Sequence, residues 1–240
     1  MIEIRNLTKQ FGDKVAVDNL SFTIPDGKVY GFLGPNGAGK TTTIRCICGL
    51  DTNYTGDIII NGHNGRSEAQ SVKKCIAYVP DEPKFYEFLS GNQYLNFIAD
   101  VFGISTKNRE NLIMRYCDVF DFKDQLSMPI SSYSHGMKQK LSLIAAFIHS
   151  PSVIILDEPL VGLDAKTAKV LKTALRQYAN DGNTVFYSTH VMDVAERFCD
   201  EFEIINKGKS VFNGSFEALK AEVGVSDSTL EDIFLELTEI

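Results

Sequence analysis

Long apolar runs are missing from this sequence of 240 residues. It contains no stretch of 18 or more apolar residues, and the alternating start Met1–Arg5 lacks the apolar core of a signal peptide. We therefore expect a chain that does not insert into a membrane by itself.

Basic runs and paired cysteines are also scarce. The longest basic run is Lys73-Lys74, and 24 lysines and arginines face 31 aspartates and glutamates, a formal charge of −7. This balance argues against an obligate nucleic-acid partner. The scattered cysteines form no CxxC pair, which argues against a disulfide framework or zinc knuckle and favours a reducing cytosol. Each is expected to be a small buried apolar residue: Cys46, Cys48, Cys75, Cys117 and Cys199.

The overall composition is that of a globular protein. A hydrophobic fraction of 44% and a charged fraction of 23% exclude disorder and fibrous repeats. At about 150 residues per domain, the length corresponds to one large domain or two coupled ones.

Short apolar runs alternate with helical patterns along the chain. Residues 28–33, 153–157 and 184–189 are continuous apolar runs, as in strands that are covered on both faces. Residues 2–21 and 56–62 instead carry β-hairpin turn signals. The sequence therefore predicts an α/β fold with a mostly parallel sheet and an antiparallel β flank.

The middle of the chain has helical patterns. Ser90 and Gln93 form a capping box, Gly103 provides a stop, and further helices follow Thr106 and Ser134. A second capping box, Ser228 to Glu231, predicts a helix in the tail. We expect four segments: an α/β core made of 1–82 and 151–215, a helical subdomain at 83–150 and a C-terminal helical tail at 216–240.

The segment Gly34–Thr41 matches the pattern G-x-x-x-x-G-K-[ST] between a predicted strand and a predicted helix. In such a loop, backbone N–H groups point at phosphate oxygens, Lys40 reaches the β- and γ-phosphates, and the Thr41 hydroxyl ligates magnesium. The pattern predicts a P-loop NTPase core that binds a nucleoside triphosphate through Asn36, Gly37, Ala38, Gly39, Lys40, Thr41 and Thr42.

Two consecutive carboxylates end the predicted strand 153–157. A carboxylate at the C-terminal edge of an open α/β sheet lies where such sheets bind ligands. Asp157 can hold magnesium, and Glu158 can accept a proton from a water molecule that attacks the γ-phosphate.

With these two motifs, four further segments make residues 1–215 resemble the ATP-binding subunit of ABC transporters. They are Phe11, the signature loop Tyr133–Met137, the D-loop Val161–Asp164 and Ser188–His190. The resemblance implies a Mg2+-dependent ATPase in which Phe11 stacks on adenine, His190 contacts the γ-phosphate, and Ser134, Gly136 and Asp164 belong to the site.

The resemblance also implies partners. Two ATPase subunits close head to tail around two ATP molecules and drive a separate transmembrane permease subunit, so that this chain is peripheral at the cytoplasmic face of the membrane. The sequence is most similar to bacterial drug, bacteriocin or ion exporter ATPases. The aromatics Phe85, Tyr86, Phe88 and Tyr94 either dock the permease or form a core for the helical segment.

Several positions depart from the family pattern or allow a second interpretation. Asp81 replaces a glutamine, so it is a metal- or water-side residue or a turn opener, and it cannot donate to the attacking water. His135 and Met137 replace Gly and Gln in the signature loop. Asp164 is also a good helix N-cap, and Phe11 could be a simple hairpin aromatic.

Three other functions compete. The first is a cytosolic ABC-type ATPase that acts as an assembly or regulatory module without a membrane partner. The second is a GTPase or kinase, but Asn206–Lys209 lacks the final aspartate of a guanine-binding motif. The third is an ATP-dependent switch with little hydrolysis. The transported substrate and the direction of transport cannot be inferred from the sequence.

Overall fold

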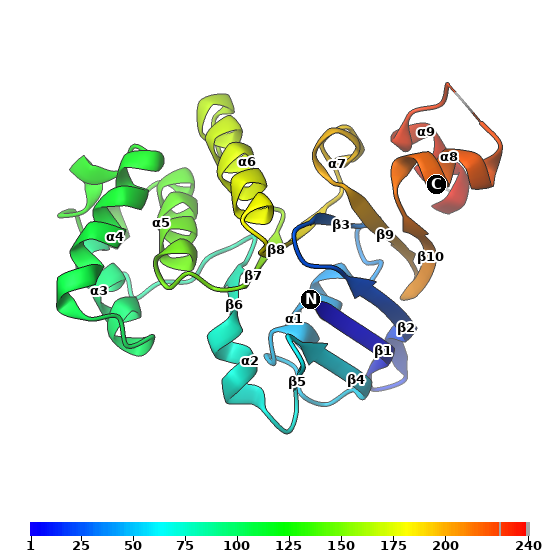
Figure 1. Ribbon diagram of the computed structural model, residues 1–240, viewed down its shortest axis with the longest axis horizontal. Helices are drawn as coiled ribbons and strands as arrows, with labels where there is room; N and C mark the ends of the chain where they lie inside the picture. The colour runs from blue at the N-terminus through cyan, green and yellow to red at the C-terminus, as the bar shows by residue number, and fades with distance from the viewer. Residues whose placement is uncertain (226, 239–240) are drawn as a thin grey trace.

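The computed structural model describes residues 1–225 and 227–238, whose strands form two sheets (Figure 1). The antiparallel sheet has the order β2-β1-β4-β5. The larger sheet has the order β10-β9-β3-β8-β7-β6 and is parallel except for the edge strand β10. The strands are β1 (Ile2–Phe11), β2 (Lys14–Ile24), β3 (Val29–Leu33), β4 (Thr55–Ile60), β5 (His63–Asn64), β6 (Ile76–Val79), β7 (Val153–Asp157), β8 (Thr184–Thr189), β9 (Glu201–Asn206) and β10 (Lys209–Gly214).

The three predicted apolar strands are confirmed as β3, β7 and β8, and every residue in them is buried. They are neighbours in the parallel sheet, in the order β3-β8-β7. Their C-terminal ends therefore meet at one edge, which brings together the loops that follow Leu33, Asp157 and Thr189. The predicted α/β fold with an antiparallel flank is confirmed.

The helices cover the sheets and extend beyond them (Figure 1). Helices α3, α4 and α5 lie at one end of the molecule and α8 and α9 at the other. The helices are α1 (Lys40–Ile47), α2 (Ala69–Cys75), α3 (Gly91–Val101), α4 (Thr106–Val119), α5 (His135–Ile148), α6 (Ala165–Asn180), α7 (Met192–Phe198), α8 (Phe216–Val223) and α9 (Leu230–Thr238), with single 3-10 turns at Lys123–Gln125 and Ile130–Ser132.

The predicted helix starts are confirmed at Ser90, whose capping box with Gln93 is complete, and at Ser134, whose hydroxyl accepts from the Met137 N–H. The predicted box at Ser228 is wrong. The reciprocal bonds join Thr229 and Asp232: the Thr229 N–H donates to Asp232 Oδ2 (3.0 Å) and the Asp232 N–H donates to Thr229 Oγ1 (3.2 Å). Packing sets this register, because α9 buries Leu230 at its first position.

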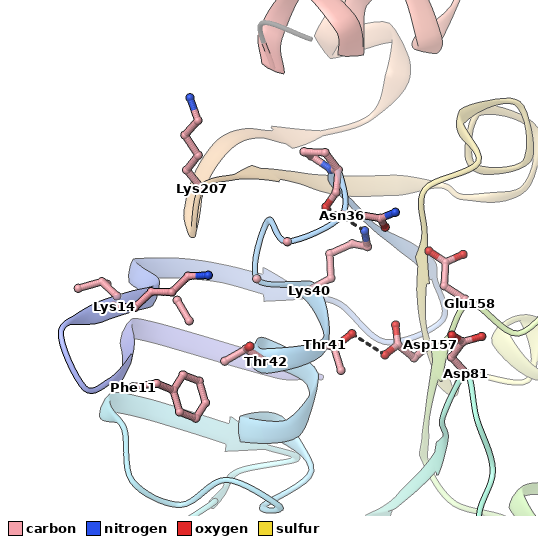
Figure 2. Close-up of a pocket in the computed structure, with 15 residues that line it drawn as sticks. Phe11, Lys14, Asn36, Lys40, Thr41, Thr42, Asp81, Asp157, Glu158 and Lys207 are labelled. Carbon is pink, nitrogen blue, oxygen red and sulfur yellow. Dashed lines mark hydrogen bonds between the residues drawn. The ribbon is translucent and has the colours of Figure 1, made fainter.

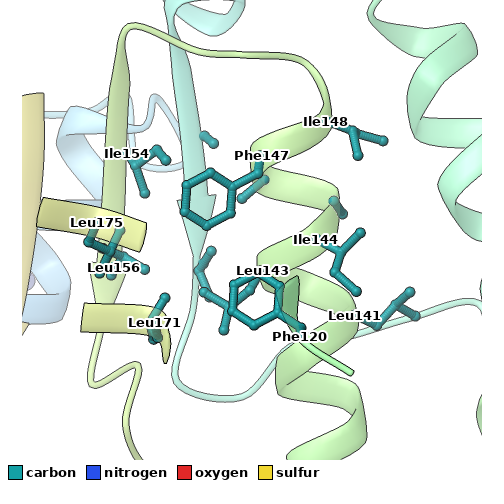
Figure 3. Packing of buried hydrophobic residues seen from close by; sticks show 14 of the residues in the cluster. Phe120, Leu141, Leu143, Ile144, Phe147, Ile148, Ile154, Leu156, Leu171 and Leu175 are labelled. Carbon is teal, nitrogen blue, oxygen red and sulfur yellow. The ribbon is translucent and has the colours of Figure 1, made fainter. Parts of the chain in front are cut away.

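The hydrophobic core is divided among three clusters. The first joins helices α3–α5 to α6 and one face of the parallel sheet, with Phe147 of α5 pointing toward Ile154 and Leu156 of β7 (Figure 3). The second fills the space between the two sheets, where the Phe22 ring stacks on that of Tyr30. The third packs α8 and α9 against β9, β10 and the end of β3.

All five cysteines have free thiols, and Cys46, Cys48 and Cys117 are buried as predicted, while the other two are half-buried. Within residues 1–225 and 227–238, each helix falls short of the length and apolar character that crossing a bilayer requires.

Candidate nucleotide site

The loop between β3 and α1 is shaped by glycine. Gly39 adopts φ +110, and a Cβ there would come within 2.6 Å of the Ala16 carbonyl oxygen. Only a residue without a side chain allows β2 to pass this close to the loop. The Gly208 N–H, from the turn between β9 and β10, also donates to Ala38 O (2.9 Å). Two hairpins thus hold the loop in place from outside.

Lys40 is the first residue of α1, and its side chain reaches back to the start of this loop. Its side chain is buried, and Nζ donates to the carbonyl oxygens of Gly34 (2.5 Å) and Pro35 (3.3 Å). Burial lowers the pKa of Lys40, against the opposing effect of the negative charges of Glu158 and Asp157. The loop therefore holds an ammonium group where the sequence predicts the β- and γ-phosphates.

Thr41 and Asp157 form the second part of the site. Thr41 Oγ1 donates to Asp157 Oδ2 at 3.0 Å, which links the start of α1 to the end of β7 (Figure 2). Burial raises the pKa of Asp157, and the hydrogen bond from Thr41 counteracts the rise. The Thr41 hydroxyl and the Asp157 carboxylate both offer oxygen atoms as metal ligands, and magnesium prefers oxygen ligands.

Glu158 follows directly and has an uncommon backbone. Its φ is +48, in the left-handed region, and its N–H donates to Ser188 O (3.0 Å). Each carboxylate oxygen has a partner at the end of β8 or directly after it. Thr189 Oγ1 donates to Oε2 (3.1 Å), and His190 Nδ1 lies 2.7 Å from Oε1. The half-buried carboxylate of Glu158 is thus fixed by hydrogen bonds beside the phosphate loop.

A cavity of about 540 Å³ brings most of the predicted residues together (Figure 2). Its lining includes the predicted Phe11, Asn36, Gly37, Gly39, Lys40, Thr41, Thr42, Asp81, Asp157 and Glu158. It also includes residues that the sequence reasoning missed: Lys14, Val15, Ala16, Pro35 and Lys207. Four of these lie on β2 or in the turn between β9 and β10, and no motif marks their approach to the loop.

Five predicted residues lie outside that lining. Ala38 is buried behind the loop, and His190 reaches the site only through Glu158. Ser134 and Asp164 are exposed helix N-caps, and Gly136 follows in the first turn of α5. The Thr167 N–H donates to Asp164 Oδ1 (2.8 Å), and the hydrogen bonds from Thr167 lower the pKa of Asp164.

The signature loop and the D-loop contact each other within this chain. Gly162 has φ +78, and a Cβ there would overlap the His135 ring, at 2.2 Å from Cδ2. A Cβ on Gly136 would lie 2.8 Å from Gly162 O. His135, which departs from the family pattern, is thus accommodated by a glycine in the neighbouring loop.

Comparisons with known proteins agree with this geometry. Residues 17–161 match the family model described as ABC transporter. The chain is 32% identical to the ABC-type transporter ATP-binding protein EcsA of Bacillus subtilis, over 100% of this chain and 97% of EcsA. It is also 32% identical to the probable multidrug ABC transporter ATP-binding protein YbhF of Escherichia coli, over 99% of this chain but 41% of YbhF.

Solved structures show the same fold. An ATP-binding subunit of an ABC transporter superposes with a TM-score of 0.94 at 29% identity, covering 99% of both chains. The dimeric cassette MJ0796 bound to ADP and Pi gives a TM-score of 0.81 at 22% identity, covering 90% of this chain and 98% of that one. The chain belongs to the ABC transporter family, as an ATP-binding subunit with ATPase activity.

Proposed function

We propose that this chain pairs head to tail with a second ATPase subunit around two ATP molecules and drives a separate membrane subunit from the cytoplasmic face, for export. The Glu158–His190 contact of 2.7 Å beside the phosphate loop carries the hydrolytic part of the proposal. The exposed N-terminus of α5 at Ser134, outside the cavity lining, carries the pairing. Export is supported by relatives such as the Nod factor export ATP-binding protein I of Burkholderia lata, which is 34% identical over 93% of this chain and 76% of that protein.

ATP occupies the 540 Å³ cavity in this proposal, with its phosphates at Lys40 and its base at Phe11. The loop amides from Asn36 to Gly39 and the N-terminus of α1 bind phosphate oxygens. Phe11 is half exposed and lines the same cavity, so one face of its ring is available to the adenine.

Thr41 and Asp157 would hold magnesium, and Asp81 lines the same cavity. The ion neutralises charge on the phosphate oxygens when it is bound. Asp157 must be ionised for this role, and the hydroxyl of Thr41 already stabilises the ionised form.

Glu158 acts as the general base. Its two oxygens are oriented by Thr189 and His190, so the carboxylate is fixed before water arrives. Asp81 cannot donate a hydrogen bond to that water when it is ionised, which leaves Glu158 as the group that orients it. With His190 Nδ1 occupied by Glu158, Nε2 is free to contact the γ-phosphate.

The second subunit supplies what the cavity of one chain lacks. Ser134 and Gly136 lie at the exposed N-terminus of α5, outside the cavity lining. N-terminal amides of a helix bind phosphate. We place them against the γ-phosphate held by the other subunit, so that ATP joins the two chains and its hydrolysis separates them.

The membrane subunit docks on an exposed apolar patch formed by α3 and the segment before it and made of Tyr86, Phe88, Phe97 and Val101. Phe88 is 81% exposed, and the Tyr86 ring contacts that of Phe97 edge-on at 5.9 Å. Large apolar patches of this kind mark interaction surfaces. Phe85 and Tyr94 pack on each other at 4.9 Å and against the first core cluster, which supports a core role for them.

The dimer is tested with Glu158→Gln, which should bind ATP without hydrolysing it. With ATP and magnesium, this variant should elute as a dimer in size-exclusion chromatography, and adding Lys40→Ala should return it to a monomer. A monomer in both cases contradicts the dimer. Cell fractionation tests the membrane subunit: the native protein should be recovered with the membranes and should be released from them by a high-salt wash. Recovery without membranes favours an assembly or regulatory module.

A further inference from the structure

A lysine is buried beneath Phe11 without lining the nucleotide cavity. Lys9 is only 3% exposed, and its Nζ lies 4.5 Å from the centroid of the Phe11 ring. The two residues are two positions apart on β1, where the pairing with β2 is irregular, and the contact itself places both side chains on the same side of the strand. Phe11 lines the cavity and Lys9 does not, so the ammonium group supports the ring from the side that faces the protein.

The ammonium group is fixed by other partners. Lys9 Nζ donates to Asn53 O (2.8 Å) and forms an ion pair with Asp51 Oδ1 (3.3 Å). Asp51 Oδ2 in turn accepts from Arg45 Nε (3.2 Å). Burial raises the pKa of Asp51, but the hydrogen bonds from Arg45 and Lys9 outweigh it and lower the pKa. The ammonium group of Lys9 is thus fixed by Asn53 and Asp51.

This arrangement needs an explanation, because burying an ammonium group is costly and an apolar side chain would fill the same space. A cation over the face of an aromatic ring attracts it, which limits the positions of a ring that is otherwise half exposed. A ring that is already in place loses less side-chain freedom when a ligand stacks on it.

We propose that Lys9 is a positioning residue for nucleobase binding, which holds the Phe11 ring ready for the base to stack on its free face. The proposal rests on the adenine-stacking role of Phe11 given above. It predicts that Lys9 affects ligands that carry a base and leaves the phosphate loop unaffected.

The test compares ADP with inorganic pyrophosphate, both with magnesium, by isothermal titration calorimetry. Lys9→Met keeps the length of the side chain and removes the charge. It should weaken ADP binding about threefold to tenfold and change pyrophosphate binding less than twofold. In a Phe11→Leu background, which itself weakens ADP binding, Lys9→Met should have no further effect.

Arg66→Met is the matched control. Arg66 lies over the Tyr54 ring at 4.3 Å, as Lys9 lies over Phe11, but neither of these residues lines the cavity. This variant should leave both affinities unchanged. If Lys9→Met does not fold, Asp51→Asn removes an anchor of Lys9 and should weaken ADP binding in the same selective way, to a smaller extent.

The outcomes separate the two ideas. If Phe11→Leu leaves ADP binding unchanged, adenine stacking is wrong and the role of Lys9 fails with it. If Phe11→Leu weakens ADP binding but Lys9→Met does not, or if Lys9→Met weakens pyrophosphate binding equally, the role of Lys9 alone is overturned.

Discussion

The phosphate half and the signature half of the predicted nucleotide site lie in contrasting surroundings. In the phosphate half, Lys40 and Asp157 are buried charges at the edge of the parallel sheet, and Glu158 is held by Thr189 and His190 at the end of β8. In the signature half, Ser134 and Asp164 are exposed helix caps. The phosphate half therefore has its functional groups fixed by contacts within one chain. The signature half instead has helix N-termini whose backbone amides lie at the surface.

The contrast yields the largest expected effect at Glu158. Glu158→Gln should slow single-turnover ATP hydrolysis about a thousandfold, the scale of a lost general base, with ATP affinity changed less than twofold. The matched control is Glu68→Gln, which alters another Glu–His pair, Glu68 Oε1 to His63 Nδ1 at 2.9 Å, outside the cavity. Equal hydrolysis rates for Glu158→Gln and wild type would remove Glu158 as the base.

A second expected effect concerns a buried charge behind the phosphate half. Glu203 on β9 is fully buried beside β3, which leads into the phosphate loop. Asn213 Nδ2 donates to it at 2.7 Å, and burial raises the pKa of Glu203 from 4.5 to about 7. Between these values the folded chain binds a proton that the unfolded chain has released, so the free energy of unfolding falls as pH rises.

Glu203→Gln removes this titration. The free energy of unfolding of the wild type should fall by about 3 kcal/mol between pH 4.5 and 7, and the variant should lack this fall. Urea unfolding at pH 5, 6 and 7.5 measures it. Glu201→Gln, on the same strand but partly exposed, is the control and should keep the wild-type slope. A wild-type stability that does not fall over this interval would contradict the prediction.

A smaller effect is expected in the signature half. Ser134→Ala should lower steady-state hydrolysis about tenfold, because it removes a cap and a hydroxyl that we propose faces the second subunit, and should leave the ATP affinity of the monomer unchanged. Ser215→Ala removes an equivalent cap, where the Ala218 N–H donates to Ser215 Oγ (3.2 Å) on α8. A matching loss of activity in both variants would show a general stability effect instead.

The smallest effect on nucleotide binding should come from the proposed docking patch on α3 and the segment before it. Tyr86→Glu and Phe88→Glu should uncouple transport and release the chain from membranes, with ATP affinity within twofold of wild type. Leu235→Glu charges an exposed apolar residue on α9, at the other end of the molecule (Figure 1), and should do neither. Transport that persists in both patch variants would rule out this docking surface.

Local patterns predicted the phosphate half well, because its chemistry is contiguous in the sequence. The loop Gly34–Thr41 and the pair Asp157–Glu158 each follow a fully buried strand. Parallel pairing of those strands through β8 then brings the two motifs together. Glycine turns and apolar runs are strong signals. They predicted the parallel strands and the loops at their C-terminal ends, where the cavity lies.

The residues that were missed depend on long-range packing. Lys14 begins β2 of one sheet and Lys207 lies in the turn between β9 and β10 of the other, and both reach the cavity because each hairpin packs on the loop. The cap at Thr229 was misplaced by one residue because the burial of Leu230 and its N–H bond to Glu196 Oε2 (2.8 Å) fix where α9 begins. Lys9 gave no signal, since an isolated lysine in a strand indicates an exposed face.

The left-handed backbone of Glu158 has a further consequence. Successive side chains of a strand point to opposite faces, yet Asp157 and Glu158 both line the cavity. The turn of the chain at φ +48 ends the alternation at that point. The two carboxylates that we propose for cation binding and for proton uptake are therefore carried by consecutive residues joined by one peptide bond, so a movement of the surrounding loops shifts both of them together.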